Sequence, residues 1–348
     1  MFNIQYRPYT LDLKYVFRIS RGARTSTPLL LTAIEFEGVT GYGEASMPPL
    51  YGESHESAIN FIKKVDLSGF NDPMDIDGMM QYVDSIDAGN TAAKAAIDIA
   101  LHDIAGKVAD KPVYQLFNLP GVDSIATSKT IGLDKSEIIK ERVQEAKEFP
   151  FLKIKMGSVN DREVMDAVKS VSDAPLYVDA NQGWKEKSLA LDNIHWLKEH
   201  GVVFVEQPMP VEMEEEMAWL KDKSPLPIVG DEGIQRLTDV QRADNFYHAI
   251  NIKLVKSTGL NEGLKMAKLA KEKDMKVMLG CMSETSCLIS AAFQLASLAD
   301  WIDLDGNLGV TNNPYKGIET VKGKLINNEL PGIGLINPEA AWENITKQ

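Results

Sequence analysis

The chain is poor in cysteine, has no surplus of basic residues and contains no long apolar run, and each absence excludes a class of protein. Only two cysteines, Cys281 and Cys287, occur among 348 residues, too few for a disulfide-rich secreted scaffold. We therefore expect buried free thiols and a cytoplasmic, reducing location. The formal net charge of −13 opposes binding to nucleic acid or to an anionic membrane surface.

No apolar run approaches the roughly 20 residues that a membrane-spanning helix needs. The first fifteen residues alternate like a strand and do not resemble a signal sequence. What is present, 44% hydrophobic residues in a chain of this length, suffices for a large core and a second module. We expect a small-molecule partner, and the sequence leaves open whether the chain forms a homo-oligomer.

Two parts of the chain differ in their secondary-structure pattern. Residues 1–125 carry strand-like stretches followed by helical patterns, which predicts an α+β capping domain. Residues 126–319 alternate strand and helix patterns, which predicts an α/β fold, a modified TIM (β/α) barrel. The irregular segment from about 320 to 348 is expected to return to the first domain. The eight predicted barrel strands are Ser128–Ile131, Leu152–Met156, Leu176–Ala180, Val202–Glu206, Ile228–Asp231, Ile250–Leu254, Lys276–Cys281 and Trp301–Asp305.

Charged residues close five successive apolar runs, namely Lys155, Asp179, Glu206, Asp231 and Lys253. The gaps between them are 24, 27, 25 and 22 residues, about the length of one strand, one helix and two short loops. Active sites of β/α barrels lie at the carboxyl ends of the strands. The spacing therefore predicts an active site at that end of the barrel.

Asp179, Glu206 and Asp231 are the predicted metal ligands. Three carboxylates from adjacent strands offer hard oxygen ligands to one face of an octahedral ion and leave positions for water and a substrate oxygen. This favours Mg²⁺, with one ion per subunit. Each residue alone would also suit a helix cap, a turn or a strand exit. The metal prediction depends on all three occurring at strand spacing.

Lys155 and Lys253 are predicted on opposite sides of the barrel, with the metal-bearing strands between them. Lysines on strands are more often edge residues that block pairing. Here the two amines would face each other across the ion, so that a proton could leave one face of a carbon and return to the other. To act as a base, a lysine must be neutral, and lowering its pKa from about 10.4 to about 8 requires roughly 3.3 kcal/mol. Because alternate residues share a strand face, Lys153 is placed to act as a second ammonium, which at about 6 Å supplies roughly 2.8 kcal/mol.

These residues resemble the motifs of the muconate-lactonizing subgroup of the enolase superfamily, over nearly the whole chain. The matching motifs are Lys153-x-Lys155, Asp179-x-Asn181, Glu206-Gln207-Pro208, Asp231-Glu232 and Lys253. A lysine base and an Mg²⁺-stabilised ene-diolate are general features of that superfamily. The resemblance implies a capping domain on a modified barrel, Mg²⁺ bound to a substrate carboxylate, and exchange of the α-proton between Lys155 and Lys253. Lys153 would also contact the developing oxyanion.

The last strand and the loops separate activities within that subgroup. Asp303 and Asp305 resemble the Asp-x-Asp of dipeptide epimerases, in which paired carboxylates receive a free ammonium; a polar loop start is the alternative. Arg24 lies in a segment, 20–25, whose small residues suit a mobile lid. It aligns with the arginine that similar L-Ala-D/L-Glu epimerases direct at a glutamate side chain, although a solvated lid arginine is the alternative. The further substrate contacts implied are Thr130, Cys281 and Met282. For Cys281 no neighbouring base supports a nucleophilic role.

The leading hypothesis is an Mg²⁺-dependent dipeptide epimerase that inverts the α-carbon of the C-terminal residue, with L-Ala-D/L-Glu from murein peptide as the first substrate. Alternatives with the same fold are an N-succinylamino acid racemase, an o-succinylbenzoate synthase, a cycloisomerase, or a dipeptide epimerase of other specificity. Two rivals come from other classes. One is a binding or structural protein that has the barrel fold but no catalytic activity. The other is a lysine aldolase that forms a Schiff base.

Overall fold

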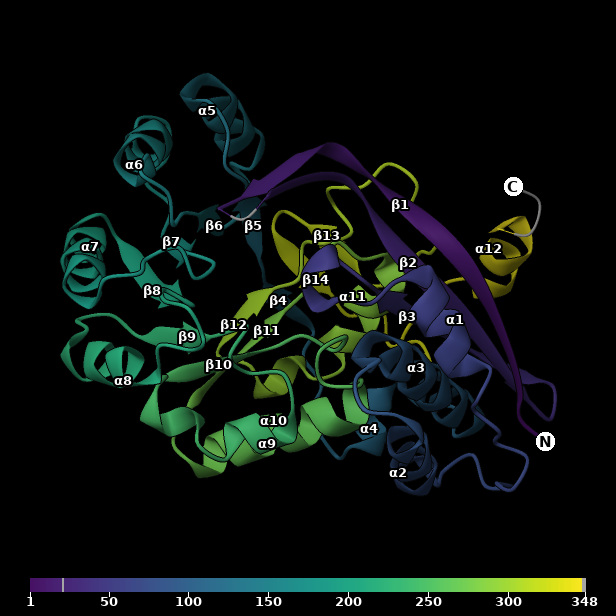
Figure 1. Cartoon of the computed structure of the whole chain (residues 1–348). Coiled ribbons are helices and arrows are strands. Elements are labelled where there is room, and N and C mark those ends of the chain that lie inside the picture. The colour runs from purple at the N-terminus through teal and green to yellow at the C-terminus, as the bar shows by residue number, and fades with distance from the viewer. Residues whose placement is uncertain (21, 346–348) are drawn as a thin grey trace.

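The computed structural model describes residues 1–20 and 22–345, which form a capping domain beside a barrel (Figure 1). The capping domain contains a three-stranded antiparallel sheet in the order β1-β2-β3. Its elements are β1 (Asn3–Ile19), β2 (Gly22–Phe36), β3 (Val39–Ser46), the 3-10 helix η1 (Pro49–Tyr51), α1 (His55–Ile62), α2 (Ile76–Ile86), α3 (Thr91–Val108) and α4 (Val113–Leu116). Among the described residues, no helix is both long enough and apolar enough to cross a membrane.

Helix α3 packs closely against the capping sheet because small residues line both surfaces. Gly43 of β3 lies so near the helix that a Cβ at this position would be 1.9 Å from the carbonyl oxygen of Ala96. The Thr32 hydroxyl donates a hydrogen bond to the same oxygen at 3.0 Å. The alanine-rich helix α3 is thus one of the helical patterns expected within residues 1–125, and it is buried along most of its length.

The barrel is an eight-stranded parallel sheet in the order β5 to β12 that curls until it is nearly closed. Its strands are β5 (Ser128–Ile131), β6 (Phe151–Lys155), β7 (Leu176–Asp179), β8 (Val202–Glu206), β9 (Ile228–Gly230), β10 (Ala249–Ile252), β11 (Lys276–Gly280) and β12 (Trp301–Asp303). Its helices are α5 (Ser136–Glu145), α6 (Asp161–Lys169), α7 (Lys187–Glu199), α8 (Glu214–Lys223), α9 (Leu237–Val240), η2 (Ala243–Asn245), α10 (Leu260–Glu272), α11 (Ser286–Phe293) and η3 (Ala296–Leu298). The predicted fold class and all eight predicted strands are confirmed.

An apolar floor fills the amino-terminal half of the barrel. The rings of Phe151, Tyr177 and Phe204 stack along neighbouring strands, with centroid separations of 5.1 and 4.4 Å. Because alternate side chains share a strand face, the residues two positions further on also point inward. They form a polar layer above this floor: Lys153, Asp179, Glu206, Asp231, Asn251 and Asp303.

Side chains close the seam between β12 and β5, the two ends of the barrel sheet. The backbone N–H of Leu304 donates to Thr127 Oγ1 at 2.9 Å, and the Ser128 hydroxyl donates to Asp303 Oδ1 at 2.6 Å. The last residue of β12 and the residue that follows it therefore lie next to the start of the sheet. The seam brings Asp303 beside β5.

The C-terminal segment contacts both ends of the capping domain. Strands β13 (Glu319–Val321) and β14 (Lys324–Ile326) form a small antiparallel sheet with β4 (Ser124–Ala126). Helix α12 (Pro338–Ile345) lies beside β1, where the Arg7 guanidinium sits 3.8 Å from the centre of the Trp342 ring. These contacts support our proposal that the C-terminal segment, from about 320 to 348, forms one domain with residues 1–125. The barrel domain would then span 126–319.

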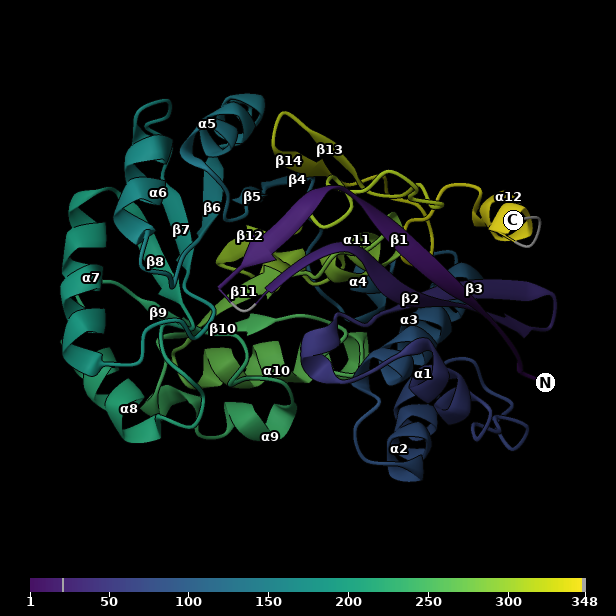
Figure 2. The same cartoon turned by 45° about the horizontal axis from the view of Figure 1, so that its top comes forward.

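The segment expected to be a mobile lid is largely a strand. Gly22 to Arg24 pair with Ile19 to Phe17 of β1, and β2 continues without interruption to Phe36. Residues 22–25 therefore belong to a hairpin and not to an open loop, because the partner strand supplies backbone hydrogen bonds that the small residues alone did not predict. Movement of this hairpin as a lid stays a prediction. Arg21 lies outside the described residues. Figure 2 shows this hairpin reaching from the capping domain over the barrel strands.

Candidate active site

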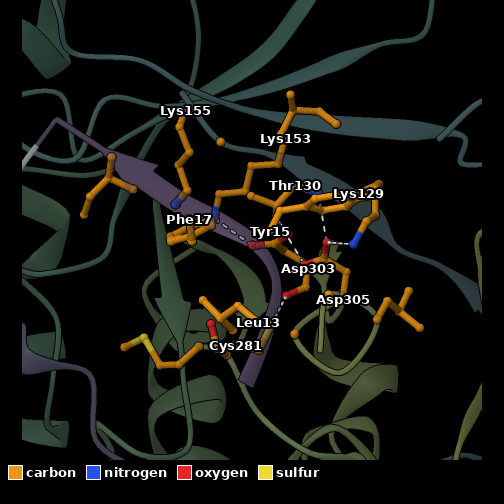
Figure 3. Close-up of a pocket in the computed structure, with 18 of the residues that line it drawn as sticks. Leu13, Tyr15, Phe17, Lys129, Thr130, Lys153, Lys155, Cys281, Asp303 and Asp305 are labelled. Atoms are coloured by element: carbon orange, nitrogen blue, oxygen red, sulfur yellow. Dashed lines mark hydrogen bonds and ion pairs between the residues drawn. The ribbon is translucent and has the colours of Figure 1, made fainter. Parts of the chain in front are cut away.

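A cavity of about 560 Å³ lies between the β1–β2 hairpin and the carboxyl ends of the barrel strands (Figure 3). Most predicted site residues line it: Arg24, Thr130, Lys153, Lys155, Asp231, Lys253, Cys281, Met282, Asp303 and Asp305. The two remaining predicted residues, Asp179 and Glu206, are fully buried and contact the lysines that line the cavity. The structure thus brings all the predicted residues to one place.

Asp179, Glu206 and Asp231 form a buried acidic cluster whose ligand oxygens lie within 4.8 Å of one another. Burial, together with the charge of Asp179, raises the pKa of Glu206 to about 7. Three carboxylates at this separation repel one another unless cations compensate them. An all-oxygen set of this kind suits a hard divalent cation such as Mg²⁺, so the residues present fit a metal ion.

Amide side chains orient two of the carboxylates. Asn181 Nδ2 donates to Asp179 Oδ2 at 3.2 Å, and Asn251 Nδ2 donates to Glu206 Oε1 at 2.8 Å. The Asn251 side chain fits here only because Gly280, beside it on β11, has no side chain. A Cβ on Gly280 would lie 2.4 Å from the Asn251 side-chain oxygen, which is too close. Asn251 was not predicted, although its position two residues before Lys253 places it on the same strand face.

Lys153 and Lys155 meet the acidic cluster from β6. Lys153 Nζ lies 2.6 Å from Glu206 Oε2 and 2.7 Å from Asp303 Oδ2. Burial lowers the pKa of Lys153, but the charges of Asp303, Glu206 and Asp179 outweigh it and raise that pKa well above its ordinary value. Lys153 is therefore a fixed ammonium, as predicted. Lys155 Nζ lies 2.6 Å from Asp179 Oδ2.

Lys253 meets the cluster from the opposite flank, with its Nζ 2.7 Å from Asp231 Oδ2. In the sheet, β7, β8 and β9 separate β6 from β10, so the three acids lie between Lys155 and Lys253. A second lysine, Lys256, places its Nζ 2.6 Å from Asp231 Oδ1. Lys256 was not predicted. The sequence feature that could have indicated it is its position three residues after Lys253, where the chain leaves the barrel strand.

Asp303 and Asp305 are held at the seam by residues of β5. Asp305 Oδ2 accepts hydrogen bonds from the Thr130 backbone N–H at 2.8 Å and from Lys129 Nζ at 3.0 Å (Figure 3). Thr130 Oγ1 donates to Asp305 Oδ1 at 3.1 Å. Lys129 was not predicted, because strand alternation places its Cβ on the face opposite Thr130. Its long side chain nevertheless reaches the same carboxylate.

Arg24 projects into the cavity without an acidic partner among the described residues. Its Nη2 donates to Ser283 Oγ at 3.0 Å, and its guanidinium lies 5.0 Å from the centre of the Phe17 ring. Its Nε finds no hydrogen-bond partner within residues 1–20 and 22–345. Burial lowers the pKa of Arg24 to about 10. A buried, poorly paired guanidinium can receive an anionic ligand group, and a carboxylate fits its planar donors.

Cys281 and Met282 contribute to the cavity wall as predicted. Both cysteines of the chain are free thiols. Burial, with a contribution from the charge of Glu284, raises the pKa of the Cys281 thiol well above its ordinary value, and the thiol donates to the Asp303 carbonyl oxygen at 3.1 Å. A protonated, hydrogen-bonded thiol is a wall residue rather than a nucleophile.

Comparison with known proteins supports the likeness to one superfamily along the chain. Residues 138–335 match the family described as "Enolase C-terminal domain-like", and residues 5–118 match "Mandelate racemase / muconate lactonizing enzyme, N-terminal domain". The L-Ala-D/L-Glu epimerase of Bacteroides thetaiotaomicron is 50% identical over 94% of this chain and 86% of its own length. The L-Ala-D/L-amino acid epimerase of Pedosphaera parvula is 38% identical over 92% of this chain and 95% of its own length.

A solved structure gives the same picture in three dimensions. The dipeptide epimerase of Enterococcus faecalis, in complex with Mg and the dipeptide L-Leu-L-Tyr, superposes with a TM-score of 0.89 at 29% sequence identity. The match covers 95% of this chain and 98% of that one. Both the capping domain and the barrel are therefore shared.

Proposed function

Because the chain belongs to the enolase superfamily, with both domains of its mandelate racemase and muconate lactonizing enzyme group, we propose that it is an Mg²⁺-dependent dipeptide epimerase that inverts the α-carbon of the C-terminal residue. Its relatives are named epimerases and racemases, and the chain is an enzyme of that class. The observation that carries the proposal is the placement of Lys155 and Lys253 on opposite flanks of one buried acidic cluster.

Asp179, Glu206 and Asp231 would hold the metal ion. When bound, this ion would supply positive charge to the substrate carboxylate, which acidifies the neighbouring C–H bond. One lysine, in its neutral form, takes the α-proton as the C–H bond breaks, and the electron pair moves into the carboxylate to give an ene-diolate. The other lysine, as an ammonium, returns a proton to the opposite face. Protons and charge balance over the cycle, and only the configuration changes.

The fixed ammonium of Lys153 lies at the cavity wall in this scheme, where it can stabilise negative charge that develops on the substrate carboxylate. The fully buried side chain, paired with Asp303 and Glu206, keeps that charge in place without reorganisation.

The substrate is recognised at its two ends. The Asp303 and Asp305 carboxylates at the seam would receive the free ammonium of the N-terminal residue. Arg24 would pair with a carboxylate on the C-terminal side chain, which selects glutamate. The half-identical relative named L-Ala-D/L-Glu epimerase supports the same substrate. We extend the proposal to a role in murein peptide metabolism in the cytoplasm. Thr130, Cys281 and Met282 would line the pocket for the peptide between these ends.

The test is isotope exchange in D₂O with L-Ala-L-Glu and L-Ala-D-Glu. The wild-type enzyme is expected to incorporate one deuterium at the α-carbon of glutamate and to interconvert the two dipeptides. Lys155→Ala and Lys253→Ala, with unchanged circular dichroism, are each expected to lose epimerisation by at least about 10³-fold, because removing either group breaks the two-sided proton transfer. Native exchange rates in both variants would refute the two-lysine scheme.

A further inference from the structure

Lys129 of β5, which was not predicted, forms an ion pair with one of the two carboxylates that are proposed to bind the substrate ammonium. Its Nζ lies 3.0 Å from Asp305 Oδ2. The other carboxylate, Asp303, is paired with Lys153 at 2.7 Å. Both acids of the seam therefore already have one cationic partner each, and the charges of this group of four residues balance.

The two cations differ in how firmly they are held. The Lys153 side chain is 2% exposed and lies within ion-pair distance of three acids, Asp303, Glu206 and Asp179. The Lys129 side chain is 23% exposed and pairs with Asp305. Lys129 is therefore the cation that can shift when a ligand arrives, while Lys153 stays in place.

The cavity continues beyond the seam into a region lined by β1, by α5 with the residues that follow it, and by the turn between β13 and β14. The charged side chains there are Lys14, Arg142, Glu145, Glu148 and Lys322. Arg142 is already paired with Asp134 at 3.3 Å. Lys14 and Lys322 then stand against Glu145 and Glu148, so the formal charges of this lining nearly cancel and Lys129 is the cation in contact with Asp305.

Charge balance at the seam then depends on the N-terminal residue of the substrate. A dipeptide ammonium adds a third positive charge beside Lys129 and Lys153, against the two carboxylates. A carboxylate on the N-terminal side chain would restore equal numbers, whereas a basic side chain would make four positive charges against two. Because the ammonium must contact Asp305, the side chain on the same residue lies within roughly 6 Å of Lys129 Nζ, close enough for a strong interaction at an effective dielectric near 20.

We propose that Lys129 makes this end of the cavity favour an anionic over a cationic side chain on the N-terminal residue of the dipeptide, with the neutral L-Ala as the reference between them. The inference rests on the proposed dipeptide epimerase activity and extends it to the second substrate residue. Lys129 acts here as a specificity-determining residue. It leaves the chemistry at the α-carbon to Lys155 and Lys253.

The experiment compares kcat/KM for L-Asp-L-Glu, L-Ala-L-Glu and L-Lys-L-Glu in the wild-type enzyme and three variants. In the wild type, L-Asp-L-Glu is expected to exceed L-Lys-L-Glu by at least about tenfold, because Lys129 is partly exposed and its field is partly screened. Lys129→Met is expected to lower this ratio about tenfold, and Lys129→Arg to keep it. The matched control is Lys322→Met, which removes a lysine that lines the same cavity without touching Asp305, and it should leave the ratio within about twofold.

The ratio distinguishes specificity from a merely structural role. If Lys129 only stabilised the contact between β5 and β12, Lys129→Met would lower kcat/KM for all three dipeptides by the same factor. The ratio would then stay constant, which would overturn the inference. An equal change in the Lys322→Met control would also overturn it, because the whole cavity rather than Lys129 would then set the preference. If the wild type fails to epimerise even L-Ala-L-Glu, the proposed function is refuted, and the inference with it.

Discussion

Arg24→Met should weaken the preference for an acidic C-terminal residue, and the structure sets the size of the effect. Burial lowers the pKa of Arg24 from 12.5 to about 10, which corresponds to a penalty of about 3 kcal/mol for holding the charge in the cavity. A substrate carboxylate that pairs with the guanidinium recovers a similar amount. We therefore expect Arg24→Met to lower kcat/KM for L-Ala-L-Glu by about 10²-fold.

The assay measures epimerisation of L-Ala-L-Glu and L-Ala-L-Leu by chiral chromatography. L-Ala-L-Leu should stay within a few-fold of wild type, because the methionine side chain replaces a charge that leucine never paired with. Arg18→Met is the matched control. Arg18 lies on the same hairpin, but its side chain is 44% exposed and pairs with Asp134 at 3.1 Å, so its loss should change neither substrate by more than about twofold.

Two results would refute the reasoning. Equal losses for L-Ala-L-Glu and L-Ala-L-Leu would mean that Arg24 only positions the hairpin through Ser283 and Phe17. An unchanged rate with L-Ala-L-Glu would mean that the substrate side chain lies elsewhere. Arg24→Lys separates charge from shape, because an ammonium keeps the charge but loses the planar fork of donors, and it should give an intermediate rate.

Three further outcomes are expected. Chelation with EDTA should abolish α-proton exchange and added Mg²⁺ should restore it, whereas full activity after chelation would remove the acidic cluster from the mechanism. Asp305→Asn should lower kcat/KM for L-Ala-L-Glu about 10- to 100-fold but leave an N-succinyl amino acid, if it is turned over, nearly unchanged, since only the dipeptide has a free ammonium. Asp303→Asn is a poorer probe, because it also removes a partner of Lys153. Burial raises the pKa of Glu44 from 4.5 to about 7 despite its hydrogen bonds from Thr285, so its contribution to stability is full below about pH 4.5 and is lost as the pH rises through about 7. Glu44→Gln should therefore raise Tm relative to wild type more at pH 8 than at pH 5, and an equal shift at both would contradict a protonated Glu44.

The sequence predicted the barrel well because its strands are short apolar runs that end in charge. Strands β5 and β8 agree with the predicted bounds, and the other six differ by no more than two residues. The rhythm of strand and helix is a local property, so it is visible without knowledge of contacts. The hairpin was less predictable, because residues 22–25 become a strand only through pairing with β1, which is a tertiary contact. Helix α8 shows a different limit of sequence patterns. Its first turn is entirely acidic, Glu214 to Glu216, and only two of its residues are buried, so its apolar periodicity is weak.

Within the site, alternation along the strands predicted which residues share a face, but it did not predict how far their side chains reach. Lys129 shows this limit. The direction of its Cβ predicts that it points away from the cavity, but its side chain is long enough to reach Asp305. Lys256 shows another limit, since it follows the end of β10, where the period of two no longer applies. Both omissions are long, flexible cations that sequence pattern places only approximately.

The charges of the polar layer connect these residues to the proposed chemistry. Four buried lysines face four buried carboxylates: Lys153, Lys155, Lys253 and Lys256 against Asp179, Glu206, Asp231 and Asp303. These ion pairs explain how so many charges tolerate burial. A divalent cation held by Asp179, Glu206 and Asp231 would add positive charge between Lys155 and Lys253. The ion pairs that stabilise this layer in the fold thus also place both amines on the two sides from which the proposed proton transfer takes place.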